Sequence, residues 1–175
     1  CLQTTTGTTV DPASAKPRTE VLGCGLMGPA APKSRVDIQG YEHDWLGCAV
    51  DGCVALFSTA GGGYAPPEYL GDTDSHAQAI DLLLARPAST TTRFHPSLAP
   101  HLANTWKMVA ERGLYAYDSD PLGGSFRLVA APIVPVRIDE LPSVVASVAG
   151  GVRLAFRFIH ETMLSESSFA TRATS

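Results

Sequence analysis

A glycine-rich loop is the first segment of this chain whose residue types could bind a ligand. Ser58-Thr59-Ala60-Gly61-Gly62-Gly63 follows an apolar run, as phosphate-binding loops follow a strand. The loop lacks the Gly-Lys-Ser/Thr ending, and Pro66-Pro67 stands where a helix would begin. We therefore favour a close-packed or flexible connection. Two alternatives stay open: a small ligand-binding domain or enzyme that uses Gly61–Gly63, and an exposed recognition loop with Tyr64 and Tyr69.

Metal-binding chemistry has little support in the spacing of the histidines and aspartates. None of the histidines forms His-Glu-x-x-His or another ligand spacing: they are His43, His76, His95, His101 and His160. Asp72, Asp74 and His76 can be drawn as one site, but acids at a helix N-terminus explain both aspartates. Asp118-Ser119-Asp120 is typical of a turn and needs no Ca²⁺. We predict no metal and no cofactor.

Nucleophilic catalysis has no motif in the chain either. A Gly-x-Ser-x-Gly elbow is absent, and a triad of Ser58, His95 and Asp118 is only one of many that a chain of this length permits. The four cysteines (Cys1, Cys24, Cys48 and Cys53) lack a zinc spacing. We expect Cys48 and Cys53 to be reduced thiols, which favours the cytoplasm. No catalytic residue is assigned, and a non-enzyme is favoured.

A β-hairpin is the most strongly predicted element. Asp51-Gly52 separates two apolar runs, strand 45–50 and strand 53–58, as a two-residue turn would. This turn places residue 50 opposite 53 and residue 48 opposite 55. One face then collects Leu46, Cys48, Val50, Cys53, Ala55 and Phe57, and the other collects Trp45, Gly47, Ala49, Val54 and Leu56.

The remaining pattern alternates helices and strands around this hairpin. Hydrophobic spacing predicts helices over about 72–86, 101–112 and 141–149, and strands over 36–39, 114–118, 126–131, 133–138 and 152–159. Since strands lie next to each other in sequence, we predict an α+β fold, a mainly antiparallel sheet with about three helices packed on one side.

The two ends differ in composition from the middle. Residues 1–35 are rich in Thr, Pro, Ala and Gly and predict a disordered or tether-like tail, residues 36–160 a single globular domain, and residues 161–175 a frayed tail. Cys1 followed by a polar stretch fits a processed lipoprotein, so an envelope location is the alternative to the cytoplasm. No apolar run is long enough for a transmembrane segment.

Charge is distributed unevenly along the 175 residues. The formal net charge is −4, which argues against nucleic acid as a partner. Residues 36–85 contain no Lys or Arg, yet they hold eight acids: Asp37, Glu42, Asp44, Asp51, Glu68, Asp72, Asp74 and Asp81. Chance in a charge-poor chain is one explanation. The other is a negative surface that meets a positive partner.

Three segments carry a resemblance to a known class of protein. Asp44-Trp45, the run from Val50 to Gly61, and Ala110-Glu111-Arg112-Gly113-Leu114-Tyr115-Ala116-Tyr117-Asp118 resemble small bacterial immunity-type proteins, the antitoxins of polymorphic-toxin systems. The resemblance covers roughly residues 41–160. It implies a non-enzymatic protein that blocks a toxin, often through acidic or aromatic surfaces.

Three functional hypotheses follow. The first is an immunity protein that neutralises a basic toxin domain, with partner-binding residues Trp45, Asp51, Tyr64, Glu68, Tyr69 and Asp72. The second is a small ligand-binding domain or enzyme that uses Gly61–Gly63, which predicts a concave pocket at that loop with converging polar groups and a carboxylate or histidine of shifted pKa. The third is a lipid-tethered envelope protein.

Overall fold

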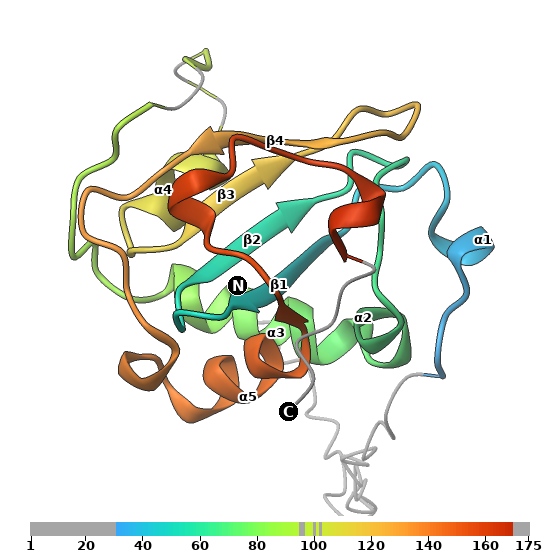
Figure 1. Cartoon of the computed structure of the whole chain (residues 1–175), viewed down its shortest axis with the longest axis horizontal. Coiled ribbons are helices and arrows are strands. Elements are labelled where there is room, and N and C mark those ends of the chain that lie inside the picture. The colour runs from blue at the N-terminus through green and yellow to red at the C-terminus, as the bar shows by residue number, and fades with distance from the viewer. Residues whose placement is uncertain (1–30, 95–96, 100, 102, 170–175) are drawn as a thin grey trace, which may run out of the picture.

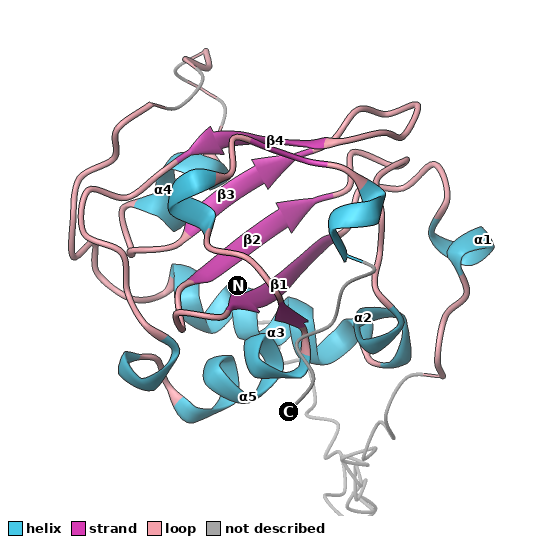
Figure 2. Ribbon diagram, viewed as in Figure 1, coloured by secondary structure: helices cyan, strands magenta, loops and turns pink. Residues whose placement is uncertain are grey.

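A six-stranded sheet forms the centre of the computed structural model, which describes residues 31–94, 97–99, 101 and 103–169 (Figure 1). The strands are β1 (Asp44–Ala49), β2 (Val54–Ser58), β3 (Tyr115–Asp118), β4 (Phe126–Ala130), β5 (Arg153–Leu154) and β6 (Met163–Leu164). Their order across the sheet is β5-β1-β2-β3-β4-β6. Helices lie against one face, and the segment after β5 crosses the other (Figure 2).

The sheet is mixed rather than mainly antiparallel. Antiparallel pairing joins β1 to β2, β3 to β4 and β4 to β6. Parallel pairing joins β1 to β5 and β2 to β3. A parallel pair needs a crossover connection, and α2, α3 and α4 lie between β2 and β3 in the chain. The α+β class is confirmed at this coarser level.

Five α-helices accompany the sheet in the described residues. They are α1 (Arg35–Ile38), α2 (Pro67–Gly71), α3 (Thr73–Leu84), α4 (Thr105–Ala110) and α5 (Ser143–Gly151). Of these, α3 and α5 contact β1, and α4 contacts β3 and β4. The three predicted helices are confirmed with shorter or shifted bounds. Side-chain caps set two of the starts: Asp72 accepts from the Ser75 N–H before α3, and Asn104 accepts from the Lys107 N–H before α4.

Three predicted strands were wrong in whole or in part. Residues 36–39 belong mostly to α1, because the Ser34 hydroxyl and the Asp37 carboxylate form a capping box around that turn. Residues 133–138 carry only an isolated bridge between Arg137 and Cys53. In 152–159 only β5 is a strand, and a 3₁₀ turn at Phe158–His160 follows it.

The hairpin is confirmed, but its register was wrong by one residue. Cys48 pairs with Val54, and the Ala49 N–H donates to the Cys53 carbonyl at 2.9 Å. The turn therefore has three residues and ends at Gly52 (φ +84°), the left-handed position that favours glycine. Since side chains alternate, this shift reverses the two faces of β2. The free thiols of Cys48 and Cys53 consequently lie on opposite faces.

Each face of the sheet has its own core. Leu46, Val54 and Leu56 meet the apolar stripes of α3 and α5 on the helical face. The opposite face is aromatic, with Trp45 stacked on Phe57 at 4.0 Å between ring centroids. Residues from near the C-terminal end of the described chain cover these rings; they include Phe158 and Phe169, both buried.

Both predicted tails reach into the described domain. The Lys33 N–H donates to the Leu70 carbonyl at 2.8 Å, and β6 together with the buried Phe169 belongs to the segment expected to fray from residue 161. The remaining tail residues, with Cys1 and Cys24, lie outside the described residues. In the part of the chain that the structure describes, no helix has the length and apolar character needed to cross a membrane.

Candidate functional site

A hollow of about 320 Å³ lies beside the first residue of β1, and we call it the acidic hollow. Carboxylates from two elements line it: Glu42 and Asp44 at the start of β1, and Asp74 and Asp81 on α3. The two α3 residues are seven positions apart and therefore share one helical face. Among the described residues that line it, Lys33 is the one with a Lys or Arg side chain.

Asp44 lies half-buried in the wall of the acidic hollow. Its Oδ1 is shielded from solvent and has no hydrogen-bond partner among the described residues. Burial raises the pKa of Asp44, and the nearby Glu42 carboxylate adds to that rise. The Ser58 hydroxyl donates to Glu42 Oε1 at 3.0 Å, which ties the two strand ends together. A cation in the hollow would therefore act on the Asp44 carboxylate through its charge and not through direct contact with Oδ1.

Asp118 extends this acidic end of the sheet. Asp44 pairs with Ser58 across β1 and β2, and Ser58 pairs with Asp118 across β2 and β3, so the three side chains stand in a row on one face. Burial raises the pKa of Asp118 to about 6, and the carboxylates of Glu42 and Asp44 contribute. Three carboxyl groups at one sheet end therefore repel one another in their ionised forms.

His43, His76 and Tyr69 connect α2 and α3 to β1 and to the loop before it. His76 on α3 is buried, and its Nδ1 accepts the Leu46 N–H at 3.0 Å. Burial lowers the pKa of His76 to about 4, which keeps the ring neutral and able to accept. The Tyr69 hydroxyl lies 2.9 Å from His43 Nδ1, and the Tyr69 ring contacts His76 edge to face.

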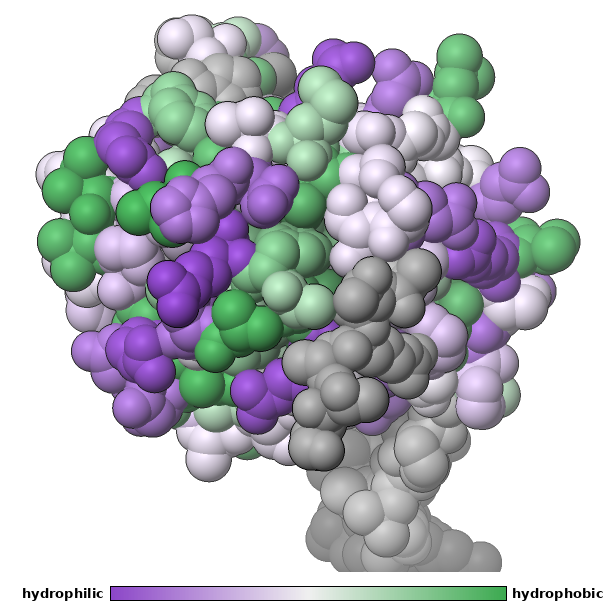
Figure 3. Space-filling view, in the orientation of Figure 1, coloured by the Kyte–Doolittle hydropathy of each residue, from purple (hydrophilic) through white to green (hydrophobic). Residues whose placement is uncertain are grey.

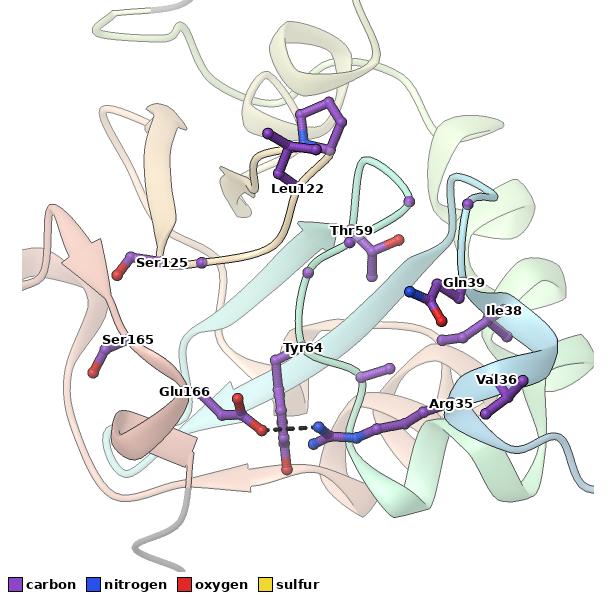
Figure 4. Close-up of a pocket in the computed structure, with 17 residues that line it drawn as sticks. Arg35, Val36, Ile38, Gln39, Thr59, Tyr64, Leu122, Ser125, Ser165 and Glu166 are labelled. Atoms are coloured by element: carbon purple, nitrogen blue, oxygen red, sulfur yellow. Dashed lines mark hydrogen bonds and ion pairs between the residues drawn. The ribbon is translucent and has the colours of Figure 1, made fainter.

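A second, larger hollow of about 660 Å³ lies at the glycine-rich loop, and we call it the glycine groove (Figure 4). One wall is α1 with Gly40, the second is the loop from Thr59 to Ala65, and the third comes from the β3–β4 connection and from Ser165 and Glu166. The concave pocket expected of the second hypothesis is therefore present at Gly61–Gly63, but the carboxyl groups and the histidine with a shifted pKa, Asp44, Asp118 and His76, do not line it. Two exposed apolar side chains, Val36 and Leu122, belong to its lining.

One ion pair closes the edge of the glycine groove. Arg35 Nη1 lies 2.9 Å from Glu166 Oε1, and the guanidinium carbon is 4.7 Å from the centre of the Tyr64 ring (Figure 4). Tyr64 also stacks on Phe169, with ring centroids 4.9 Å apart. Both partners of the ion pair are more than half exposed, so the pair contributes at most about 1 kcal/mol.

The structure separates the six predicted partner-binding residues. Trp45 is fully buried and forms no part of the surface, whereas Tyr69 is 2 % exposed and is one of the residues that line the acidic hollow. Asp51 lies at the hairpin turn, where Arg137 donates to its backbone carbonyl. Asp72 is exposed and caps α3. Tyr64 and Glu68 line a small pocket beside Val152 and Leu154.

The eight acids of residues 36–85 do not form one patch. Four of them line the acidic hollow, whereas Asp37 caps α1, Asp72 caps α3 and Asp51 lies at the opposite end of β1. Across the face that the C-terminal segments cover, hydrophilic and hydrophobic side chains alternate (Figure 3). The broad negative surface of the first hypothesis is thereby reduced to one local cluster.

The other candidate sites resolve into local structure. Asp120 Oδ1 accepts the Leu122 N–H at 3.0 Å, as the turn interpretation predicted. His95, one member of the Ser58–His95–Asp118 triad considered from the sequence, lies outside the described residues. The Ser58 hydroxyl donates a hydrogen bond to Glu42. Within the described ranges, no group of three His, Cys, Asp or Glu side chains is placed to hold a metal ion.

The sequence did not reveal which acids lie close together in the fold. The spacing of Asp74 and Asp81 was an available signal, since residues seven apart on a helix share a face. The nearness of Asp118 had no such signal, because it depends on the parallel pairing of β2 with β3 across 56 intervening residues, 59–114.

Comparisons with protein-family models, with curated proteins and with solved structures found no match to this chain.

Proposed function

We propose that this protein is a non-enzymatic bacterial binding protein of the immunity type, and that its acidic hollow accepts a basic side chain of a toxin domain. The observation that carries the proposal is the set of four carboxylates around one hollow, with the Asp44 Oδ1 unpartnered among the described residues. The resemblance of residues 41–160 to immunity-type proteins agrees with this reading.

Electrostatics explains why a basic group suits this site. Burial is the main reason that the pKa of Asp44 and of Asp118 is raised, and neighbouring carboxylates add a smaller contribution that makes their ionised forms less favourable. A lysine or arginine of the partner would offset the repulsion among these carboxylates. The same field would speed encounter with a cationic domain at low salt.

Ligand binding at the glycine groove is the second candidate, favoured by the volume of that groove. Against an enzyme, the carboxyl groups with raised pKa, Asp44 and Asp118, do not line it. For the compartment we propose the cytoplasm, because Cys48 and Cys53 are free thiols. An envelope lipoprotein remains the alternative, and mass spectrometry of the native N-terminus for an acylated Cys1 distinguishes the two.

The test begins with capture of the partner from source cells, using the chain as bait, and its identification by mass spectrometry. The purified partner is then titrated calorimetrically against wild type, the double variant Asp74→Lys/Asp81→Lys, and the control Asp139→Lys, whose exposed acid lies outside the hollow. We expect a basic partner that is toxic when expressed alone, and at least tenfold weaker binding only for the double variant. Equal affinity of all three proteins would overturn the electrostatic role.

A further inference from the structure

Two opposite charges line the glycine groove and are paired with each other. Arg35 comes from α1 on one wall and Glu166 from the C-terminal segment on another, so their ion pair joins the two walls (Figure 4). Among the described residues that line the groove, these two are the ones with charged side chains. A ligand with a net charge would take one member of the pair and leave the other without a partner. The lining therefore favours a ligand whose own charges cancel.

The ion pair opens at small cost and leaves Arg35 in position. The side chains of Arg35 and Glu166 are 55 % and 64 % exposed, and a pair so open to solvent contributes at most about 1 kcal/mol. When Glu166 turns away, the guanidinium of Arg35 keeps its contact with the Tyr64 ring, whose centre lies 4.7 Å from the guanidinium carbon. Tyr64 is in turn stacked on the buried Phe169. The guanidinium is thus held ready for an incoming carboxylate, to which it can donate two parallel hydrogen bonds.

Apolar side chains line the groove away from the ion pair. Leu122 lies at the end opposite the pair, and Ile38 of α1 lies on the wall between them (Figure 4). Leu122 is 96 % exposed, so a ligand group that covers it removes apolar surface from water. The groove volume of about 660 Å³ is that of a small-molecule pocket. The groove therefore offers a charged end and an apolar end to one small ligand.

We infer that the glycine groove binds a free α-amino acid with an apolar side chain. The carboxylate of the ligand pairs with Arg35, its ammonium group pairs with Glu166, and its side chain extends toward Leu122. The two charged groups of an α-amino acid are carried by one carbon atom and lie close together, as those of Arg35 and Glu166 do. This inference gives a ligand class to the second candidate function, on which it rests, and it does not involve the acidic hollow.

Isothermal titration calorimetry on the full wild-type chain tests the ligand class. L-leucine and L-phenylalanine are titrated first, and the tighter of the two is compared with its N-acetyl derivative, its amide and L-alanine. The acetyl group removes the ammonium charge and the amide removes the carboxylate, so each derivative should bind at least tenfold more weakly. L-alanine should also bind more weakly, because its methyl group is too short to cover Leu122 as well. These measurements use one protein, so no change of fold enters the comparison.

Substitutions then locate the site. Arg35→Gln and Glu166→Gln should each weaken binding of the tighter amino acid at least fivefold. Leu122→Ala should narrow the difference in affinity between that amino acid and L-alanine. The matched control is Lys107→Gln/Glu111→Gln, which removes an ion pair outside the groove and should bind as wild type does.

The outcomes separate this inference from both candidate functions. Absence of binding, or unchanged binding in Arg35→Gln and Glu166→Gln, would overturn the inference. Equal binding of the N-acetyl and amide derivatives would also overturn it. If Leu122→Ala still weakened that binding, a ligand site at the groove would stand with another ligand class. The immunity-type proposal is decided separately, by the partner titration with Asp74→Lys/Asp81→Lys.

Discussion

The titration of His76 makes the stability of the fold depend on pH between about 4 and 6.5. Burial lowers its pKa in the folded chain to about 4, against about 6.5 when unfolded. The unfolded chain therefore binds a proton first, and the free energy of unfolding falls as pH drops from 6.5 to 4. The shift corresponds to a loss on the order of 3 kcal/mol.

We predict that His76→Asn flattens this part of the profile. The amide oxygen can accept the Leu46 N–H but does not titrate. Urea denaturation between pH 4 and 7 measures the effect. His76→Ala is the comparison variant: it should be destabilised at every pH, by about 1–3 kcal/mol, because the Leu46 N–H is left buried without a partner. A wild-type-like slope in His76→Asn would contradict the assignment.

Asp118 acts in the opposite direction. Burial, followed by its acidic neighbours, raises its folded pKa to about 6, so its contribution to stability is present below the unfolded pKa near 4 and is lost as pH rises to 6. We predict that Asp118→Asn is more stable than wild type at pH 7, by about 1 kcal/mol once solvent screening is allowed for. Thermal denaturation at pH 7 and pH 3.5 checks this, since the gain must disappear at the lower pH.

The residue types at the site were visible in the sequence, but their exposure was not. The cation-free stretch includes the four acids that line the hollow, but the acids predicted to bind a partner were Asp51, Glu68 and Asp72, which do not line it. Trp45 and Tyr69 were both proposed as partner-binding residues, although aromatic residues are as common in cores as in interfaces. Only the packing of Trp45 on Phe57, and of Tyr69 between two histidines, distinguishes the two cases.

At the scale of elements, Gly62 decides how closely two loops approach. A Cβ atom added at Gly62 would lie 2.4 Å from the Gly123 nitrogen and 2.5 Å from the Pro121 oxygen, both backbone atoms that cannot turn aside. We predict that Gly62→Ala costs about 1–3 kcal/mol and moves the β3–β4 connection away from the loop. Gly71→Ala in α2 is the matched control, because no described residue outside its own helical turn has an atom within 4 Å of the added Cβ. Guanidinium denaturation of both variants compares them, and equal stabilities would refute the close approach.

Local sequence signals predicted most helices and strands, but not their exact ends or the pairing of the strands. The Asp72 cap and the apolar stripe of α3 are properties of neighbouring residues, so that helix was predictable. The Asp51-Gly52 pair indicated a turn but not its length, and a single extra residue, Val50, reversed the faces of β2. The parallel pairing of β2 with β3 depends on contacts that no local pattern contains.

At the scale of the whole molecule, Phe169 joins the end of the described chain to the aromatic face. Its ring contacts the rings of Trp45, Phe57, Tyr64 and Phe126. We predict that Phe169→Ala lowers the free energy of unfolding by about 3–5 kcal/mol, whereas Phe169→Leu loses much less. Urea titrations of both give the difference, and binding of a hydrophobic dye to the alanine variant would report the uncovered rings. A change below 1 kcal/mol would show that the segment after β6 adds little to the core.

The position of that aromatic cover also sets an order of events during translation. A ribosome makes Trp45 and Phe57 well before Phe158 and Phe169, and at ordinary elongation rates the interval is on the order of ten seconds. Throughout that interval the aromatic side chains of β1 and β2 lack the residues that later cover them. The acids of the hollow have already been synthesised by then. Those rings are therefore at risk of intermolecular contact until Phe158 and Phe169 have been synthesised.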